Sequence, residues 1–309
     1  MVKLNLELPE HFLEEEVRDG YTVSAEMKKI WAVELDLLNE LLRVCTEQQI
    51  EFFAIGGTML GAARHKGFIP WDDDVDLMMT RENYIKLCKC APAAFSHPYF
   101  FQTEETENGT MRGHAQLRNS ETTAILTVER KQKFQYNQGI FIDIFPLDNV
   151  PDDAAERASF FAKVKRSNLV ARGFALLSTR YSRHANNDAK GLVSKTLGPV
   201  IAPLNHVFHI SEWLYQRYEK TCMLYNNQPT AQVGLMPYAP HMSRDIYERA
   251  DVESGVVYLD YEFIKLPVPA HYEALLERQY GNWHEFVIGS SMHGEVLFDT
   301  EKSYKEYLA

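Results

Sequence analysis

The chain has 309 residues, of which 43 are acidic and 32 are basic, so its formal net charge is −11 at neutral pH. This length allows one large domain or two small ones, and a content of 45% apolar and 12% aromatic residues excludes a disordered polymer. The negative charge argues against a general nucleic-acid-binding protein, which needs excess positive charge to displace counterions from phosphates.

Neither the cysteines nor the first residues of the chain indicate export. The four cysteines include no zinc-type pair and are too few for a disulfide framework, which favours free thiols in a reducing compartment. Residues 1–21 carry acids where a signal peptide carries basic and apolar residues. The sequence also lacks an apolar run long enough to span a membrane. We therefore expect a cytoplasmic protein.

Hydrophobic periodicity predicts an α/β core at residues 25–150. Ser24 can cap an amphipathic helix that ends near residue 49. The short β-prone run 50–55 then leads into a Gly-Gly pair and a second helix. Residues 74–79 alternate charged and apolar side chains, as a half-buried strand does, and a third helix follows as far as Pro92.

The rest of the chain predicts more strands, a helical segment and a return to the core. Further strands are expected in four places, near 98–102, 114–118 and 122–128 and across 139–150. Residues 151–230 have a helical pattern, whereas 231–309 combine short β-like runs with a helix that stops at Gly281. We expect this last part to pack on the core.

The densest group of chemically active side chains is the acidic run 72–76. Four carboxylates within five residues repel one another, so an ordered site here needs a cation or several hydrogen-bond donors. In a strand, Asp74 and Asp76 share one face and present two carboxylates to a divalent ion. An EF-hand is excluded, because Leu77 and Asn83 stand where its loop needs glycine and glutamate.

Glycines, cations and one more acid complete this pattern. Gly56 and Gly57 open a helix whose free N–H groups can bind a phosphate, although such a turn is often only structural. Arg64 and His65 add cationic groups between the glycines and the acids. Asp143 lies alone in an apolar strand, where an unpaired charge is costly to bury, and is the natural third ligand. This combination is typical of metal-assisted phosphoryl transfer.

Four segments resemble the LicD family, the fukutin-related group of nucleotidyltransferase-fold enzymes: residues 54–79, 116–120, 138–151 and 276–283. The resemblance extends over about 25–285 and is weakest across 155–225. It implies an α/β (α+β) fold with a DNA-polymerase-β-like nucleotidyltransferase core, a small mixed sheet flanked by helices. The helical segment 151–230 would be added to that core.

The resemblance also implies an activity. Members of the family transfer phosphocholine from CDP-choline, or a related alcohol phosphate from its CDP carrier, to a sugar hydroxyl of a cell-surface glycan such as lipopolysaccharide, teichoic acid or capsule. We therefore expect a CDP-linked donor and a glycan or lipid-linked glycan acceptor. Mg²⁺, or Mn²⁺ in its place, would be held by Asp74, Asp76 and Asp143, with Asp72 as an additional candidate ligand. Asp143 would also accept the proton of the attacking hydroxyl.

The resemblance assigns the donor to the glycines and to nearby cations. Gly56, Gly57 and Arg64 would support the phosphate oxygens. His65 is either a phosphate contact or a structural hydrogen-bonding residue, and Arg118 is either a phosphate contact or a surface residue of a strand. The choline head group would lie against aromatic faces that the sequence does not single out.

Two other functions remain open. The same core would serve a nucleotidyltransferase, which keeps the nucleotide and releases pyrophosphate where the phosphotransferase releases CMP. A non-catalytic glycan- or nucleotide-binding protein is the third possibility, and the three candidate metal ligands argue against it.

Basic residues are concentrated in 157–195, which holds nine lysines and arginines and a single acid, Asp188. Such a stretch is either an ordinary solvated helical face or a contact with anionic lipid headgroups or a pyrophosphate-linked lipid carrier. The second alternative would place the protein peripherally at the inner face of the cell membrane.

Overall fold

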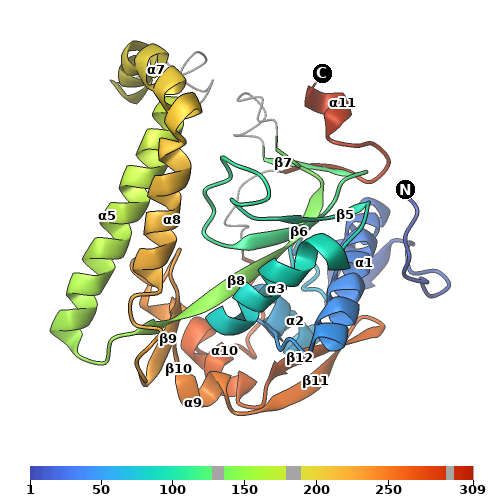
Figure 1. The fold of residues 1–309 in the computed structure, drawn as a ribbon. Coiled ribbons are helices and arrows are strands. Elements are labelled where there is room, and N and C mark those ends of the chain that lie inside the picture. Colours follow the sequence, from blue (N-terminus) through green and yellow to red (C-terminus); the bar gives the residue numbers. More distant parts are fainter. Residues whose placement is uncertain (127–135, 179–188, 290–295, 309) are drawn as a thin grey trace.

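A long central strand, β8 (Ile140–Val150), organises the computed structural model, which describes residues 1–126, 136–178, 189–289 and 296–308 (Figure 1). β4 (Asp76–Thr80) pairs with one side of β8 in parallel. β6 (Ala115–Asn119) and β9 (Gln232–Leu235) pair with successive parts of its other side, both antiparallel.

Three short strands complete the seven-stranded mixed sheet: β3 (Phe53–Ala54) beside β4, β5 (Tyr99–Gln102) beside β6, and β10 (Ile246–Glu248) beside β9. Most of β8 is buried, because apolar residues of its strand are covered by helices and loops. The mixed sheet confirms the predicted α/β class, and the DNA-polymerase-β-like topology stays a prediction.

The first three helices of the chain begin where the sequence predicts. α1 (Ala25–Gln48) starts at Ser24, whose Oγ accepts the N–H of Met27 at 3.2 Å, and it packs against β6 and β8. α2 (Gly56–His65) begins directly after β3, and α3 (Arg81–Ala94) contacts β4 and β8. α3 runs past Pro92, which lies in its last turn, so the predicted end at this proline is wrong by two residues.

Three helices form a projection from the sheet: α5 (Ala154–Ser178), α7 (Ala189–Phe208) and α8 (Ile210–Cys222). In Figure 1, α5 and α8 run side by side away from the sheet, and α7 lies at their far end. Buried side chains of α5 and α8, including Phe160 and Tyr215, form a second, smaller core. Within the described residues, no helix has both the length and the apolar character needed to cross a membrane.

The remaining elements surround the core as hairpins and short helices. They are β1 (Glu16–Arg18), β2 (Tyr21–Val23), β7 (Thr123–Leu126), the 3₁₀ helix η1 (Ser243–Asp245), α9 (Arg249–Val252), β11 (Val256–Tyr261), β12 (Ile264–Pro269), α10 (Tyr272–Tyr280), β13 (Val296–Asp299) and α11 (Lys305–Leu308). α10 contacts α2, and β12 contacts β3. The proposed division at residues 150 and 230 stays a prediction.

Strand β4 is shorter at its start than the sequence predicts. It begins at Asp76, so Asp74 lies in the preceding loop and not on the strand. The reason is the extent of the ladder, because pairing with β8 starts at Asp76 and pairing with β3 starts at Leu77. Residues 127 and 128 of the expected strand, and Asp188, lie outside the described residues.

Candidate active site

Two carboxylates predicted from separate motifs meet at the centre of the sheet. Asp76, the first residue of β4, is the register partner of Asp143 on β8, and the N–H of Asp143 donates to the carbonyl of Val75 at 2.8 Å. Paired residues on adjacent strands point to the same face, about 5 Å apart. Strand pairing therefore holds these two acids side by side.

The N-terminus of α2 faces the same acids. A Cβ atom on Gly57 would lie 2.6 Å from Oδ2 of Asp72, and one on Gly56 would lie 3.4 Å from Oδ2 of Asp76. Gly56 also has a φ of +61°, which favours glycine. The N–H of Asp76 donates to Thr58 Oγ1 at 2.8 Å, which joins the helix to the strand. The positive end of α2 is thus in close contact with the acidic run.

Asp143 has two hydrogen-bonding partners from β6 and the residue before it. His114 Nε2 lies 3.1 Å from Oδ1, and Gln116 Nε2 donates to the same oxygen at 2.7 Å. Burial would raise the pKa of Asp143, but the positive charge of His114, these hydrogen bonds and the charge of Arg112 lower it below its usual range. Asp143 is therefore ionised at neutral pH.

His114 is itself almost fully enclosed, with 7% of its side chain exposed. Its ring lies 4.3 Å from that of Phe145, and its Nδ1 is buried with no partner among the described residues. A buried imidazole with one satisfied nitrogen is costly, so the contact with Asp143 is the interaction that fixes this ring.

Arg118 reaches Asp143 only through another side chain. Only 2% of Arg118 is exposed, so the expectation of a surface residue is wrong. Its guanidinium donates to the carbonyl of Gly139 and to the side chains of Gln102 and Gln116. Because Gln116 in turn donates to Asp143, Arg118 orients the amide that contacts the acid.

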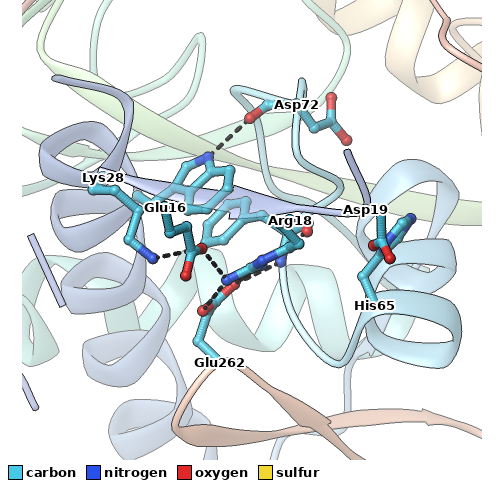
Figure 2. Close-up of polar contacts among 9 residues, drawn as sticks. Glu16, Arg18, Asp19, Lys28, His65, Asp72 and Glu262 are labelled. Atoms are coloured by element: carbon cyan, nitrogen blue, oxygen red, sulfur yellow. Dashed lines mark hydrogen bonds and ion pairs between the residues drawn. The ribbon is translucent and has the colours of Figure 1, made fainter. Parts of the chain in front are cut away.

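Arg64 and His65 lie in the last turn of α2, about 12 Å along the axis from its first residue. Arg64 Nη1 donates to the carbonyls of Trp283 and Glu285, at 2.9 and 2.8 Å. His65 Nδ1 lies 2.7 Å from Oδ2 of Asp19. Figure 2 draws His65 and Asp19 next to each other. The structure therefore does not bring these two side chains to the carboxylates, and the contacts of His65 fit the structural alternative.

Two tyrosines from the C-terminal part of the chain approach the acids. Burial raises the pKa of Tyr238, and the charges of Asp143 and Asp76 raise it further. Burial likewise raises the pKa of Tyr280, with Asp76 next in effect. Both hydroxyls therefore stay protonated and can donate hydrogen bonds. Arg244 supplies positive charge near Tyr280.

A polar and aromatic network fixes the loop that carries Asp72 (Figure 2). The indole N–H of Trp31 donates to the carbonyl of Asp72 at 2.8 Å, and its ring stacks on Phe68 at 4.6 Å. Arg18 donates to the carbonyl of Phe68 and to Glu262, which accepts the N–H of Phe68. The network therefore fixes two positions, Phe68 and Asp72, in the loop between α2 and β4.

The donor chemistry of the site fits a hard divalent cation. Within the described ranges, no three His, Cys, Asp or Glu side chains are close enough to hold a metal ion by themselves. Mg²⁺ is commonly bound by one or two carboxylates together with water and substrate phosphates, so the pair Asp76 and Asp143 suits it chemically. The metal assignment, including Asp74 and Asp72, stays a prediction.

The sequence analysis missed His114, Gln116, Tyr238 and Tyr280. His114 and Gln116 precede Arg118 by four and two residues, so their period of two could have placed them on one strand face with it. The tyrosines lie on segments far from the acids in sequence, and only the tertiary structure brings them near.

One segment of the chain, which contains Asp76, His114, Gln116 and Asp143 but not Tyr238 or Tyr280, matches a known family. Residues 49–167 match the family model described as "LicD/FKTN/FKRP, nucleotidyltransferase domain". The chain is 25% identical over 255 residues to "Lipopolysaccharide cholinephosphotransferase LicD" of Haemophilus influenzae, an alignment that covers 81% of this chain and 88% of that protein. It is also 27% identical over 110 residues to "Uncharacterized protein RP689" of Rickettsia prowazekii, covering 36% of this chain and 39% of that protein.

Proposed function

This chain belongs to the LicD family, and from that premise we propose that it transfers phosphocholine, or a related alcohol phosphate, from a CDP-linked donor to a hydroxyl of a glycan. The H. influenzae relative, whose name states cholinephosphate transfer and lipopolysaccharide, supports both the transferred group and the kind of acceptor. A lipopolysaccharide precursor is the first acceptor to test.

The observation that carries the proposal is the register pairing of Asp76 with Asp143 beside the N-terminus of α2. The donor pyrophosphate and the aspartates are both anionic and repel each other, so the pyrophosphate can bind beside them only if positive charge lies between them. The helix N-terminus supplies part of that charge. A divalent cation held by the pair Asp76 and Asp143, with Asp74 and Asp72 as further candidate ligands, would supply the rest and neutralise charge on the transferring phosphoryl group.

We assign the donor phosphates to the backbone N–H groups of Gly56 and Gly57. The close contact between the start of α2 and the acidic run requires glycine, because a side chain at Gly57 would collide with Asp72. The hydroxyls of Tyr238 and Tyr280 are candidates to donate to phosphate oxygens, since the charges of nearby acids help to keep both protonated. Arg244 and Arg112 are further candidate phosphate cations, because their charges act on Tyr280 and Asp143, whereas Arg64 is bonded to carbonyls at the other end of α2.

Asp143 is the proposed proton acceptor. Both of its described side-chain hydrogen bonds fall on Oδ1, so the carboxylate is held in one orientation with Oδ2 directed elsewhere. The acceptor hydroxyl oxygen attacks the phosphorus of the alcohol phosphate, the bond from that phosphorus to the bridging oxygen breaks, and CMP leaves. The hydroxyl proton passes to Asp143.

The test is the identity of the released product. The protein is incubated with Mg²⁺, a panel of CDP-linked alcohols and a lipopolysaccharide acceptor that lacks phosphocholine. Release of CMP that depends on the acceptor supports the proposal. Release of pyrophosphate from CTP in the presence of an alcohol phosphate or sugar would instead support the nucleotidyltransferase alternative, which the same carboxylates could serve. Nucleotide or glycan binding without turnover would favour a non-catalytic relative.

A further inference from the structure

An apolar stripe runs along the outer side of α7, at the far end of the helical projection. Its first four members recur every three or four residues and Phe208 follows the last of them, which places all five on one helical face. They are Leu197, Val200, Leu204, Val207 and Phe208, exposed to 47%, 63%, 47%, 65% and 65%. Large apolar side chains in a row at such exposure mark a surface that contacts something apolar.

The other two helices of the projection, α5 and α8, also expose large apolar side chains. Trp213 at the start of α8 is 56% exposed, and Leu169 on α5 is 74% exposed. Lys165, Arg166 and Arg172 are exposed at positions i−4, i−3 and i+3 from Leu169, so basic side chains flank it on the same face. The described residues of α7 include no acid, and those of α5 none after Glu156.

We propose that the outer face of α7, with Trp213 and the basic face of α5, docks on a membrane that contains anionic lipids. Apolar side chains enter the interfacial region while lysine and arginine contact lipid phosphates, the combination found in interfacial helices. Contact at the interface also agrees with the finding that the described helices cannot cross the bilayer.

Charge distribution selects a lipid surface over a second copy of this chain. The described helices α5 and α7 together hold seven lysines and arginines but one acid, Glu156. A symmetric dimer through this face would bring two such basic segments together, which is repulsive, whereas an anionic membrane attracts them. The strongly acidic remainder of the chain is repelled by the same membrane, which favours docking by the projection alone.

The inference changes the position of the contact expected from the sequence. The basic segment 157–195 suggests electrostatic attraction, but the apolar stripe begins at Leu197, beyond that segment, and lies outside the family match at 49–167. The attraction is therefore one part of the contact, and insertion of α7 is the other. The inference does not depend on which group the enzyme transfers.

The test is flotation of the full chain with vesicles at low salt. One vesicle is phosphatidylcholine alone, and the other is equimolar phosphatidylcholine and phosphatidylglycerol. The wild-type protein is expected to float with the anionic vesicle at least about tenfold more than with the neutral one. Absence of binding to both vesicles would overturn the proposal.

Matched variants separate the two parts of the contact. The double variant Val200→Gln/Leu204→Gln is expected to reduce flotation with anionic vesicles at least about tenfold, because two inserting side chains become polar. Lys165→Gln/Arg166→Gln is expected to remove most of the preference for anionic lipid. The control Leu224→Gln changes a residue that is 51% exposed and follows the C-terminal end of α8, and it is expected to float as wild type.

Two further results would contradict the lipid assignment. If Val200→Gln/Leu204→Gln floated as well as wild type, the α7 face would not be the contact. If sedimentation without vesicles showed a dimer that this variant loses, the face would belong to a second copy of the chain. Circular dichroism of each variant confirms that it is folded, as expected for substitutions at exposed positions.

Discussion

Asp76 and Asp143 are register partners on adjacent parallel strands, so backbone pairing alone holds two acids from distant parts of the sequence side by side. Neighbouring residues of both strands, such as Met78 and Ile144, are completely buried. The distance between the acids is therefore set by paired backbone in the buried core, which suits the proposed positioning of a phosphoryl group.

Substitution of Gly57 tests the close approach of α2 to the acidic run. Gly57→Ala places a Cβ atom 2.6 Å from Oδ2 of Asp72, so the carboxylate or the helix must shift. We expect KM for the CDP-linked donor to rise about tenfold or more, because the shift disturbs the proposed phosphate contact. Steady-state kinetics at varied donor concentration measures it.

Gly173→Ala is the matched control for that variant. Gly173 lies within α5, and a Cβ atom there meets no other atom within 4 Å. Alanine in the interior of a helix is expected to raise the free energy of unfolding by about 0.5–1 kcal/mol and to leave KM unchanged. If both variants raised KM equally, the role given to Gly57 would be wrong.

His114 is expected to act as a positioning residue for Asp143. His114→Leu removes its contact with Oδ1 and should lower kcat about tenfold while KM for the donor changes little. His114→Gln keeps a donor near that oxygen and should recover most of the loss. Measurement of kcat and KM for both variants tests this role. If His114→Gln lost as much activity as His114→Leu, the loss would instead come from changed packing on Phe145.

Trp31 is expected to hold the loop of Asp72 in place. Trp31→Phe keeps an aromatic ring against Phe68 but removes the hydrogen bond to the carbonyl of Asp72. The free energy of unfolding should fall by about 1 kcal/mol. KM for the donor should rise, because the loop that carries Asp72 is held less firmly. Trp213→Phe, at an exposed site, should change stability by about 0.5 kcal/mol or less in urea denaturation.

Glu219 is expected to make stability depend on pH. Burial raises its pKa to about 7, against the opposing charge of Arg81, which is already paired with Asp148. Between its unfolded value of 4.5 and about 7, the folded state binds more protons than the unfolded state, so stability falls as pH rises through this window.

Glu219→Gln should remove that dependence. At pH 8 the free energy of unfolding of the variant is expected to exceed that of wild type by up to about 3 kcal/mol. Below pH 4.5 the two free energies of unfolding should be closer to each other. Urea denaturation of both proteins across this pH range measures the difference. A constant difference at every pH would show that the pKa of Glu219 is the same in the folded and the unfolded state.

Periodicity and local motifs were enough to predict the elements that carry the acids. The apolar stripe of α1, the glycines that open α2 and the β-prone run of β8 appear in the sequence as they do in the structure. These features are local, because helix capping, glycine conformation and strand alternation depend on a few neighbouring residues.

Long-range contacts could not be predicted in the same way. Arg64 is near the acids in sequence, but it lies in the last turn of α2, away from the N-terminus of that helix. There it donates to the carbonyl of Trp283. Arg118 is buried, and its guanidinium donates to Gln102 and Gly139 from other segments, which a single strand does not reveal. Tyr280 approaches Asp76 only because α10 packs on α2.

The central claim is that Asp76 and Asp143 act together in acceptor-dependent release of CMP. The most direct measurement compares CMP release from CDP-choline by wild type, Asp76→Asn and Asp143→Asn, with Mg²⁺ and a lipopolysaccharide acceptor. The account predicts that wild type releases one CMP for each choline incorporated, and that each variant is folded but slower by about 10³-fold or more. Release of CMP by either folded variant at the wild-type rate would contradict it.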